Sequence, residues 1–257
     1  MYHSIIFGDG TLYPAGHPKE GQFAGTNTWD DWHLIPSSRP SVATAGVATN
    51  YVTIPGRDGS IDMTTFLVNR PVYSDRSGSW EFIVDNDHEY WETIRQKIMT
   101  FLHGKRMKFV LEDDPNWYWE GRFTVDSWNS EASNSKITIN YTVGPYKKRI
   151  ASEGDRDIIW DTFNFETDDD YYAGLGGIEL DGGDPYELTL TGYDYPSPVS
   201  ADVTVESGDS VSITFNGTTT TVSTTGVVSI GRIQPGANSL SMSGTGTVTI
   251  YFTGGSL

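Results

Sequence analysis

Histidine is the first residue type to consider, because it both transfers protons near neutral pH and binds transition metals. His88 and Glu89 begin like a zinc-protease helix, but no second histidine follows one helical turn later. The chain contains no cysteine, which excludes thiolate nucleophiles, thiolate metal sites and disulfides. We therefore expect no catalytic residue, no metal centre and no cofactor. The histidines, for which surface or helix-capping roles are expected, are His3, His17, His33, His88 and His103.

Clustered acids suggest a second kind of chemistry in the latter half of the chain. Carboxylate oxygens are the ligands that Ca²⁺ prefers, but the alternating order of an EF-hand loop is missing here. Crowded like charges also favour a solvated and exposed backbone. Two interpretations stay open, a weak Ca²⁺ site and the favoured solvated loop. The residues concerned are Asp168, Asp169, Asp170, Asp181 and Asp184.

Sugar chemistry is a third possibility, since two carboxylates across an aromatic groove can hydrolyse a glycosidic bond. The best local combination places acids at 112–114 and Glu120 beside Trp117 and Trp119, yet no spacing distinguishes a pair among the 34 acids. Tyrosines of the second half could instead stack on sugar rings. Carbohydrate binding is therefore kept as an alternative function. These tyrosines are Tyr171, Tyr172, Tyr186, Tyr193 and Tyr195.

The segment 28–62 combines tryptophans, charged residues and turn-forming prolines, a composition that suits a protruding hairpin or arm. Tryptophan and arginine most often anchor protein interfaces, and opposite charges can set the register between subunits. The alternative is that the two tryptophans fill the core of their own subunit. The candidate subunit-interface residues are Trp29, Asp30, Trp32, Arg39, Arg57 and Asp62.

Charge and composition predict two domains within the 257 residues. The net charge is −17, which disfavours ordinary binding to nucleic acid or to an anionic membrane. Residues 1–150 carry a balance of −3 and residues 151–257 a balance of −14, and seven of the eight tryptophans precede the break. No segment approaches the ~20 apolar residues that cross a bilayer, and the first residues are not expected to act as a signal peptide.

The first part is expected to contain one helix among strands. Asn86 and Glu89 have the spacing of a capping box, and Gly104 stands where a terminating glycine is common. An amphipathic stripe follows the cap, formed by Trp91, Ile94, Ile98 and Phe101. Alternating or β-rich runs predict a β-sandwich or split barrel with the helix on it. These runs are 2–7, 51–54, 61–68, 80–84, 107–111, 117–125 and 137–143.

The second part has no helical periodicity, and its short Thr- and Val-rich runs predict an antiparallel β-sandwich of jelly-roll or galectin-like type. Asn216-Gly217 predicts a type I′ hairpin, and residues 235–238 predict another turn. The glycine-rich stretches 174–177 and 244–246 are expected to form turns rather than phosphate loops. The expected strands are 158–165, 186–190, 199–205, 211–215, 219–223, 227–230, 239–242 and 247–252.

Several short motifs, in their order and spacing, resemble the N-terminal belt domain of the distal tail (Dit) proteins of long-tailed, siphovirus-type bacteriophages. The likeness covers most of residues 1–150 and, more weakly, the plan of the remainder. Its carriers are Trp29-Asp-Asp-Trp-His-Leu-Ile, Arg39-Pro40, Ile54-Pro-Gly, Asp58-Gly59, Asp62, His103-Gly-Lys, Leu111-Glu-Asp-Asp-Pro, Gly121-Arg122 and Gly144-Pro-Tyr.

The resemblance implies a structural virion protein without enzymatic activity, made in the host bacterial cytoplasm and placed at the tail tip. Residues 1–150 would form the belt of a ring, expected to be hexameric, and residues 151–257 a galectin-like domain. Such a baseplate hub joins the tail tube protein to the tail fibre or tail-associated lysin and to receptor-binding parts. DNA would cross its channel without specific binding. The alternative is a carbohydrate-binding adhesin or glycosidase accessory module, although no sugar-binding residue carries over.

Overall fold

The protein divides into two compact units, Met1–Lys147 and Lys148–Leu257, close to the predicted limit at residue 150. The computed structural model describes residues 3–67, 70–85, 88–130, 135–150 and 175–257. Within these ranges no helix is both long and apolar enough to cross a membrane. That the first part forms a ring and that the second is galectin-like stay predictions.

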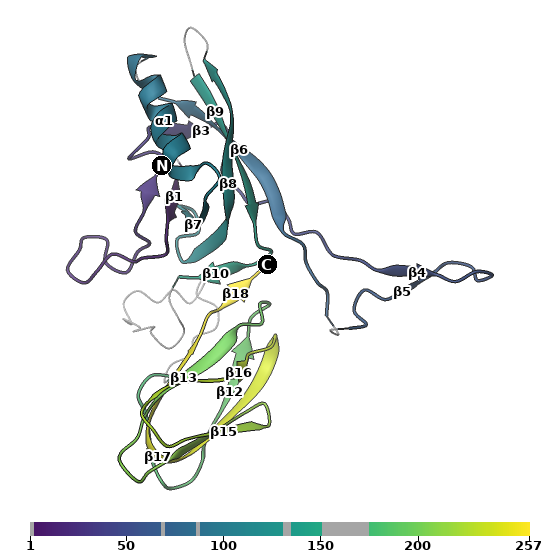
Figure 1. The fold of residues 1–257 in the computed structure, drawn as a ribbon, viewed down its shortest axis with the longest axis vertical. Coiled ribbons are helices and arrows are strands. Elements are labelled where there is room, and N and C mark those ends of the chain that lie inside the picture. Colours follow the sequence, from purple (N-terminus) through teal and green to yellow (C-terminus); the bar gives the residue numbers. More distant parts are fainter. Residues whose placement is uncertain (1–2, 68–69, 86–87, 131–134, 151–174) are drawn as a thin grey trace. The chain divides into compact units, whose positions relative to one another are not determined.

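A seven-stranded antiparallel path forms the sheet of the first unit, in the order β2-β1-β7-β8-β9-β6-β3 (Figure 1). Alternation explains why these segments become strands, since Ile137, Ile139, Tyr141 and Val143 of β9 all face the core. The strands are β1 (Ile5–Gly8), β2 (Thr26–Asn27), β3 (Leu34–Pro36), β6 (Arg76–Val84), β7 (Arg106–Leu111), β8 (Trp117–Ser130) and β9 (Ser135–Val143).

One α-helix, α1 (Trp91–Leu102), lies among the described residues, after the 3₁₀ turn η1 (His88–Tyr90). The predicted capping box is wrong, because Glu89 belongs to η1 and the N-cap is Tyr90, which makes no side-chain cap. Asn86 lies outside the described residues. The predicted stripe needs one change, since Leu102 is fully buried while Phe101 is half-buried. This shift leaves Phe101 available at the surface of the helix.

Aromatic rings fill the core of the first unit. Phe7 packs against Phe123 with ring centroids 5.1 Å apart, and Trp80 stacks on Tyr141 at 4.3 Å. These rings come from β1, β8, β6 and β9, so the core joins strands that are far apart in the sequence.

The second unit contains an antiparallel sheet path in the order β15-β14-β17-β13-β16, and β11 and β12 also pair with β17. The prediction of a mainly β chain with one helix is confirmed. The predicted strand 158–165 lies outside the described residues. The strands are β10 (Lys147–Arg149), which spans the division between the units, β11 (Ile178–Asp181), β12 (Tyr186–Gly192), β13 (Pro198–Thr204), β14 (Val211–Phe215), β15 (Thr218–Val222), β16 (Gly226–Arg232), β17 (Gly236–Phe252) and β18 (Gly255–Ser256).

The long strand β17 corrects the sequence analysis. The expected strands 239–242 and 247–252 are one strand, and the turn expected between them at 244–246 does not form. The turn expected at 235–238 is also wrong, because the strand begins at Gly236. Gly244 and Gly246 have φ values of 113° and 152°, and a Cβ on Gly244 would lie 2.1 Å from the carbonyl oxygen of Ser210. These glycines therefore permit close strand approach instead of reversing the chain.

The hairpin between β14 and β15 is confirmed as predicted. Asn216 and Gly217 both have positive φ, 48° and 81°, as a type I′ turn requires. Register then pairs Phe215 with Thr218 and Ile213 with Thr220. The described core of this unit is mainly aliphatic, and the aromatic rings buried within it are those of Phe215 and Phe252.

Candidate interaction arm

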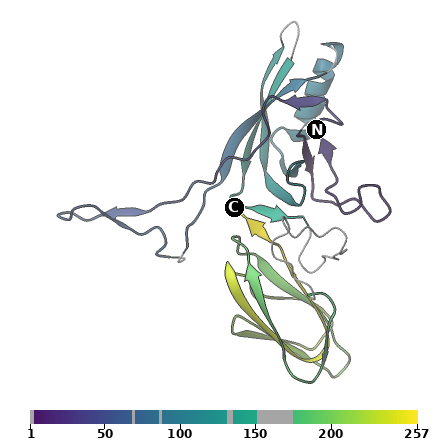
Figure 2. The same ribbon diagram turned by 180° about the vertical axis from the view of Figure 1, so that it is seen from behind.

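A long excursion between β3 and β6 forms an arm, defined here as residues 46–67 and 70–74. Its outer part is a two-stranded ladder of β4 (Tyr51–Thr53) and β5 (Ser60–Asp62). Its base is held where Ala48 N donates to the Val72 carbonyl and Ser74 N to the Gly46 carbonyl, each at 2.8 Å. Figures 1 and 2 show the arm extending away from the sheet of the first unit. The strand in this region is shorter than the predicted strand 61–68, since β5 ends at Asp62.

Exposed apolar side chains are concentrated on this arm. Of the eleven exposed large hydrophobic residues in the described part of the chain, seven belong to it. Phe66 and Leu67 are 73% and 89% exposed. Apolar surface gathered in one place is typical of a protein–protein contact site. The seven residues are Val47, Tyr51, Val52, Ile54, Phe66, Leu67 and Val72.

The chain just before the arm is fixed to the sheet by the polar ends of core aromatics. Trp80 Nε1 donates to the Ser41 carbonyl at 2.8 Å, and the Tyr141 hydroxyl donates to the same carbonyl at 3.3 Å. That hydroxyl also accepts a hydrogen bond from Ala43 N at 2.9 Å. We call residues 41–43 with Arg76 the joint. Its bonds give the arm a defined starting direction.

Arg76 completes the joint and is 8% exposed. Its Nε and Nη2 donate to the Pro145 carbonyl at 2.9 and 2.6 Å, and Nη1 donates to the Ala43 carbonyl at 3.2 Å. The guanidinium also lies over the Trp119 ring, 4.7 Å from its centroid. Burial lowers the pKa of Arg76, although arginine stays protonated near neutral pH. A buried cation therefore connects the start of the arm to the end of β9.

The two predicted tryptophans lie beside the sheet and not on the arm. Trp32 is 4% exposed and contacts Phe7 and Phe101, with centroids 6.2 and 5.5 Å away. Trp29 is half-buried against the ring of His33 at 5.7 Å. Trp32 thus fills the core of its own subunit, as the alternative interpretation expected, because the short turn between β2 and β3 directs its indole inward.

The charged interface candidates separate into two groups. Arg57 and Asp62 are exposed on the arm, and a hydrogen bond from the Thr64 hydroxyl is the main cause that lowers the pKa of Asp62. Asp30 is exposed near β2. Arg39 lies on the first unit, where its Nε contacts Asp113 at 2.7 Å. The structure thus brings two of the six candidates onto the arm.

Asp113 connects three segments of the first unit. Besides Arg39, it binds His3 Nδ1 at 2.8 Å. Burial raises the pKa of this carboxyl, but hydrogen bonds from Arg39 and His3 outweigh that effect and lower it. Arg39 therefore has a partner inside its own subunit.

The acids considered for sugar hydrolysis each contact a donor of their own. Glu112 accepts a hydrogen bond from Ser4 N at 2.8 Å, Asp114 binds Lys147 at 2.7 Å, and Glu120 binds Arg106 at 3.0 Å. Such contacts are those of surface ion pairs and turn capping.

The candidate calcium and sugar residues of the second unit that the structure describes have local contacts of their own. Asp181 Oδ1 accepts a hydrogen bond from Gly183 N at 3.0 Å, and Asp184 is exposed nearby. Lys148 and Arg149 lie over Tyr195 and Tyr193, 5.4 and 5.8 Å from the ring centroids. No group of three or more His, Asp or Glu residues is gathered for a metal within the described ranges. Tyr186 is exposed, whereas Asp168, Asp169, Asp170, Tyr171 and Tyr172 lie outside those ranges.

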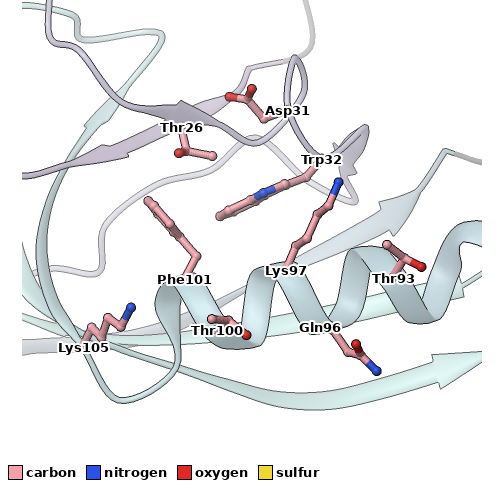
Figure 3. A pocket seen from close by; sticks show the side chains of 9 residues that line it. All are labelled: Thr26, Asp31, Trp32, Thr93, Gln96, Lys97, Thr100, Phe101 and Lys105. Carbon is pink, nitrogen blue, oxygen red and sulfur yellow. The ribbon is translucent and has the colours of Figure 1, made fainter.

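A hollow of about 680 Å³ lies between α1 and the segment around Trp32. Figure 3 shows Trp32 and Phe101 on its inner side, with Lys97 extending from the helix. Sequence reasoning missed this site, because its lysines occupy ordinary exposed positions beside α1. The lining residues are Thr26, Asp31, Trp32, Thr93, Gln96, Lys97, Thr100, Phe101 and Lys105.

Comparison with known proteins gives a structural likeness but no sequence match. No family model matches the chain, and no curated protein matches it. A solved structure of the phage SPP1 protein Dit (gp 19.1), described as a paradigm of the hub adsorption apparatus in phages infecting Gram-positive bacteria, is similar with a TM-score of 0.56. The identity is 14%, and the match covers 99% of both chains. Over nearly its whole length, therefore, the chain has a Dit-like fold.

Proposed function

We propose that this protein is a structural component of a phage tail, the hub at the tail tip or baseplate, with no enzymatic role. The observation that carries the proposal is the Dit-like fold over 99% of the chain, found in a protein described as a hub adsorption apparatus. Both units are included in that match, so the likeness extends beyond a single common domain.

The arm supports an oligomeric hub. Seven exposed apolar residues on one excursion would lose contact with water on assembly, which favours association at ~25 cal/mol per Å² of apolar surface buried. The joint preorganises the arm and so reduces the ordering cost of binding. We propose that residues 1–150 form a closed ring, with six copies as the expected number.

The partners follow from the role of a hub. The ring would join the tail tube protein to the tail fibre or tail-associated lysin, and the galectin-like 151–257 domain would carry receptor-binding parts or contact cell-wall carbohydrate. DNA would pass through the channel without specific binding, in keeping with a net charge of −17 that repels phosphate. The proposed location is the virion tail tip, after synthesis in the host cytoplasm.

Electron microscopy of the purified full chain, together with light scattering, tests this proposal. The expected result is a ring-shaped particle whose mass is a whole multiple of 28.4 kDa, with six as the expected multiple. A protein that stays monomeric at high concentration contradicts the hub role.

A further inference from the structure

We propose that the hollow beside α1 receives the arm of a neighbouring copy of this chain. The inference rests on the proposed ring and names the two surfaces that would close it. The arm and the hollow are different surfaces of the first unit, so each copy would insert its arm into one neighbour and receive the arm of another.

The placement of the two surfaces suits a head-to-tail contact. In Figures 1 and 2 the arm and α1 lie on opposite sides of the first unit. A contact between two different surfaces repeats from copy to copy, and it produces a ring when the rotation closes. An arm that bound the same arm of a second copy would stop at a dimer.

The chemistry of the hollow matches an apolar segment that carries acids. Its inner side is aromatic, formed by Trp32 and Phe101, and its charged lining residues are Lys97, Lys105 and one acid, Asp31, whose carboxylate accepts a hydrogen bond from Asn27 N at 2.7 Å. Neither lysine forms a salt bridge with a carboxylate of the described residues. Both lysines are exposed, and their aliphatic stems can cover apolar surface while the ammonium groups contact acids.

The arm supplies the complementary groups. Tyr51 and Ile54 are 59% and 41% exposed, and Asp58 follows Ile54 at the exposed tip between β4 and β5. Asp58 and Asp62 outnumber Arg57 in the hairpin of residues 51–62, whereas Arg70, the other cation of the arm, lies near its base and donates to the Tyr146 hydroxyl at 3.4 Å. Opposite charges at the edge of a contact guide association and fix its register.

The test uses the full chain and two sets of substitutions. The arm-blocked variant carries Tyr51→Ser with Ile54→Ser, and the hollow-blocked variant carries Lys97→Glu with Lys105→Glu. Since all four residues are exposed, circular dichroism should show unchanged folding. A control reverses Lys19→Glu, an exposed lysine outside the hollow that, like Lys97 and Lys105, forms no salt bridge with a carboxylate of the described residues. Thr100→Arg is a second hollow variant that blocks by bulk and leaves the lysines in place.

Analytical ultracentrifugation should show that each blocked variant has an oligomer dissociation constant raised roughly tenfold or more, while the control assembles normally. The decisive sample is an equimolar mixture of the two blocked variants. The hollow-blocked variant keeps an intact arm, and the arm-blocked variant keeps an intact hollow. The mixture should therefore form heterodimers and no larger oligomer.

Two results overturn the inference. If both hollow variants assemble like the control while the arm variant does not, the arm binds elsewhere, and the proposed ring survives without this contact. If the folded blocked variants stay monomeric when mixed, the arm and the hollow are not partners. A monomeric unaltered chain is a different result, because it removes the proposed function itself.

Discussion

The arm and the aromatic core of the first unit use similar side chains with opposite exposure. Phe7 and Phe123 are fully buried, whereas Phe66 and Leu67 are largely exposed. Folding of a single chain therefore buries the apolar side chains of the core and leaves those of the arm exposed to water. Apolar content alone therefore does not distinguish residues that stabilise the fold from residues that mediate assembly. Residues of the first kind are covered by their own chain, and residues of the second kind by another molecule.

The largest effect should come from the core. Phe123→Ala removes a ring that contacts Phe7 and Phe109, and it should lower the free energy of unfolding by about 3–5 kcal/mol. Urea denaturation measures this change. A loss below about 1 kcal/mol would mean that the cluster repacks with little cost, and the distinction between core and arm would then weaken.

The joint should show an intermediate effect. Arg76→Met keeps an unbranched apolar side chain but removes the guanidinium, which leaves the Pro145 and Ala43 carbonyls without this donor, so a loss of roughly 1–3 kcal/mol is expected. Hydrogen exchange should rise at residues 41–48, because the base of the arm is freed. Arg95→Met, which breaks only an exposed pair with Glu92, is the matched control and should leave this exchange unchanged.

Acid should act on Asp113 with a smaller effect. Its pKa in the folded protein lies below the ordinary 3.8, so its contribution is complete above that value and is lost as pH falls through the folded pKa. The contribution should stay below about 1 kcal/mol, because the Arg39 side chain is 70% exposed. Unfolding of the unaltered chain and of Asp113→Asn should differ at neutral pH and converge in acid. A gap that persists below the folded pKa contradicts this account.

The smallest effect on folding should come from the arm itself. Phe66→Ser should change the unfolding free energy by no more than about 0.5 kcal/mol, because this ring is already in water. The same substitution should weaken self-association in sedimentation experiments. Clear destabilisation of the isolated chain would show that Phe66 contributes to the fold, and the comparison would fail.

Local patterns predicted much of the fold. Alternation located β9 and β14, and Asn216-Gly217 located the hairpin between β14 and β15 together with its turn type, because these signals depend on near neighbours. The continuity of β17 was not predictable, since glycines that permit close approach to Ser210 resemble turn glycines in sequence. The predicted start of the helix was also wrong. A 3₁₀ turn precedes Trp91, so the residues expected to cap the helix lie before its first turn.

The candidate site was predicted only in part. Prolines and tryptophans indicated an arm near the right place, but Trp32 belongs to the core, and the choice between the two depends on tertiary packing. Arg57 and Asp62 do lie on the arm. Arg76 carried no sequence signal, because its partners are backbone carbonyls at Ala43 and Pro145, distant along the chain.

The seventeen-residue strand β17 has a mechanical consequence. Its first half pairs with β12 and β14 and its second half with β11 and β13, and residues 240–242 and 247–248 pair with a strand on each side. In these two stretches a force applied along the strand must shear the hydrogen bonds on both sides together. Tension along β17 would therefore act on hydrogen bonds to four neighbouring strands.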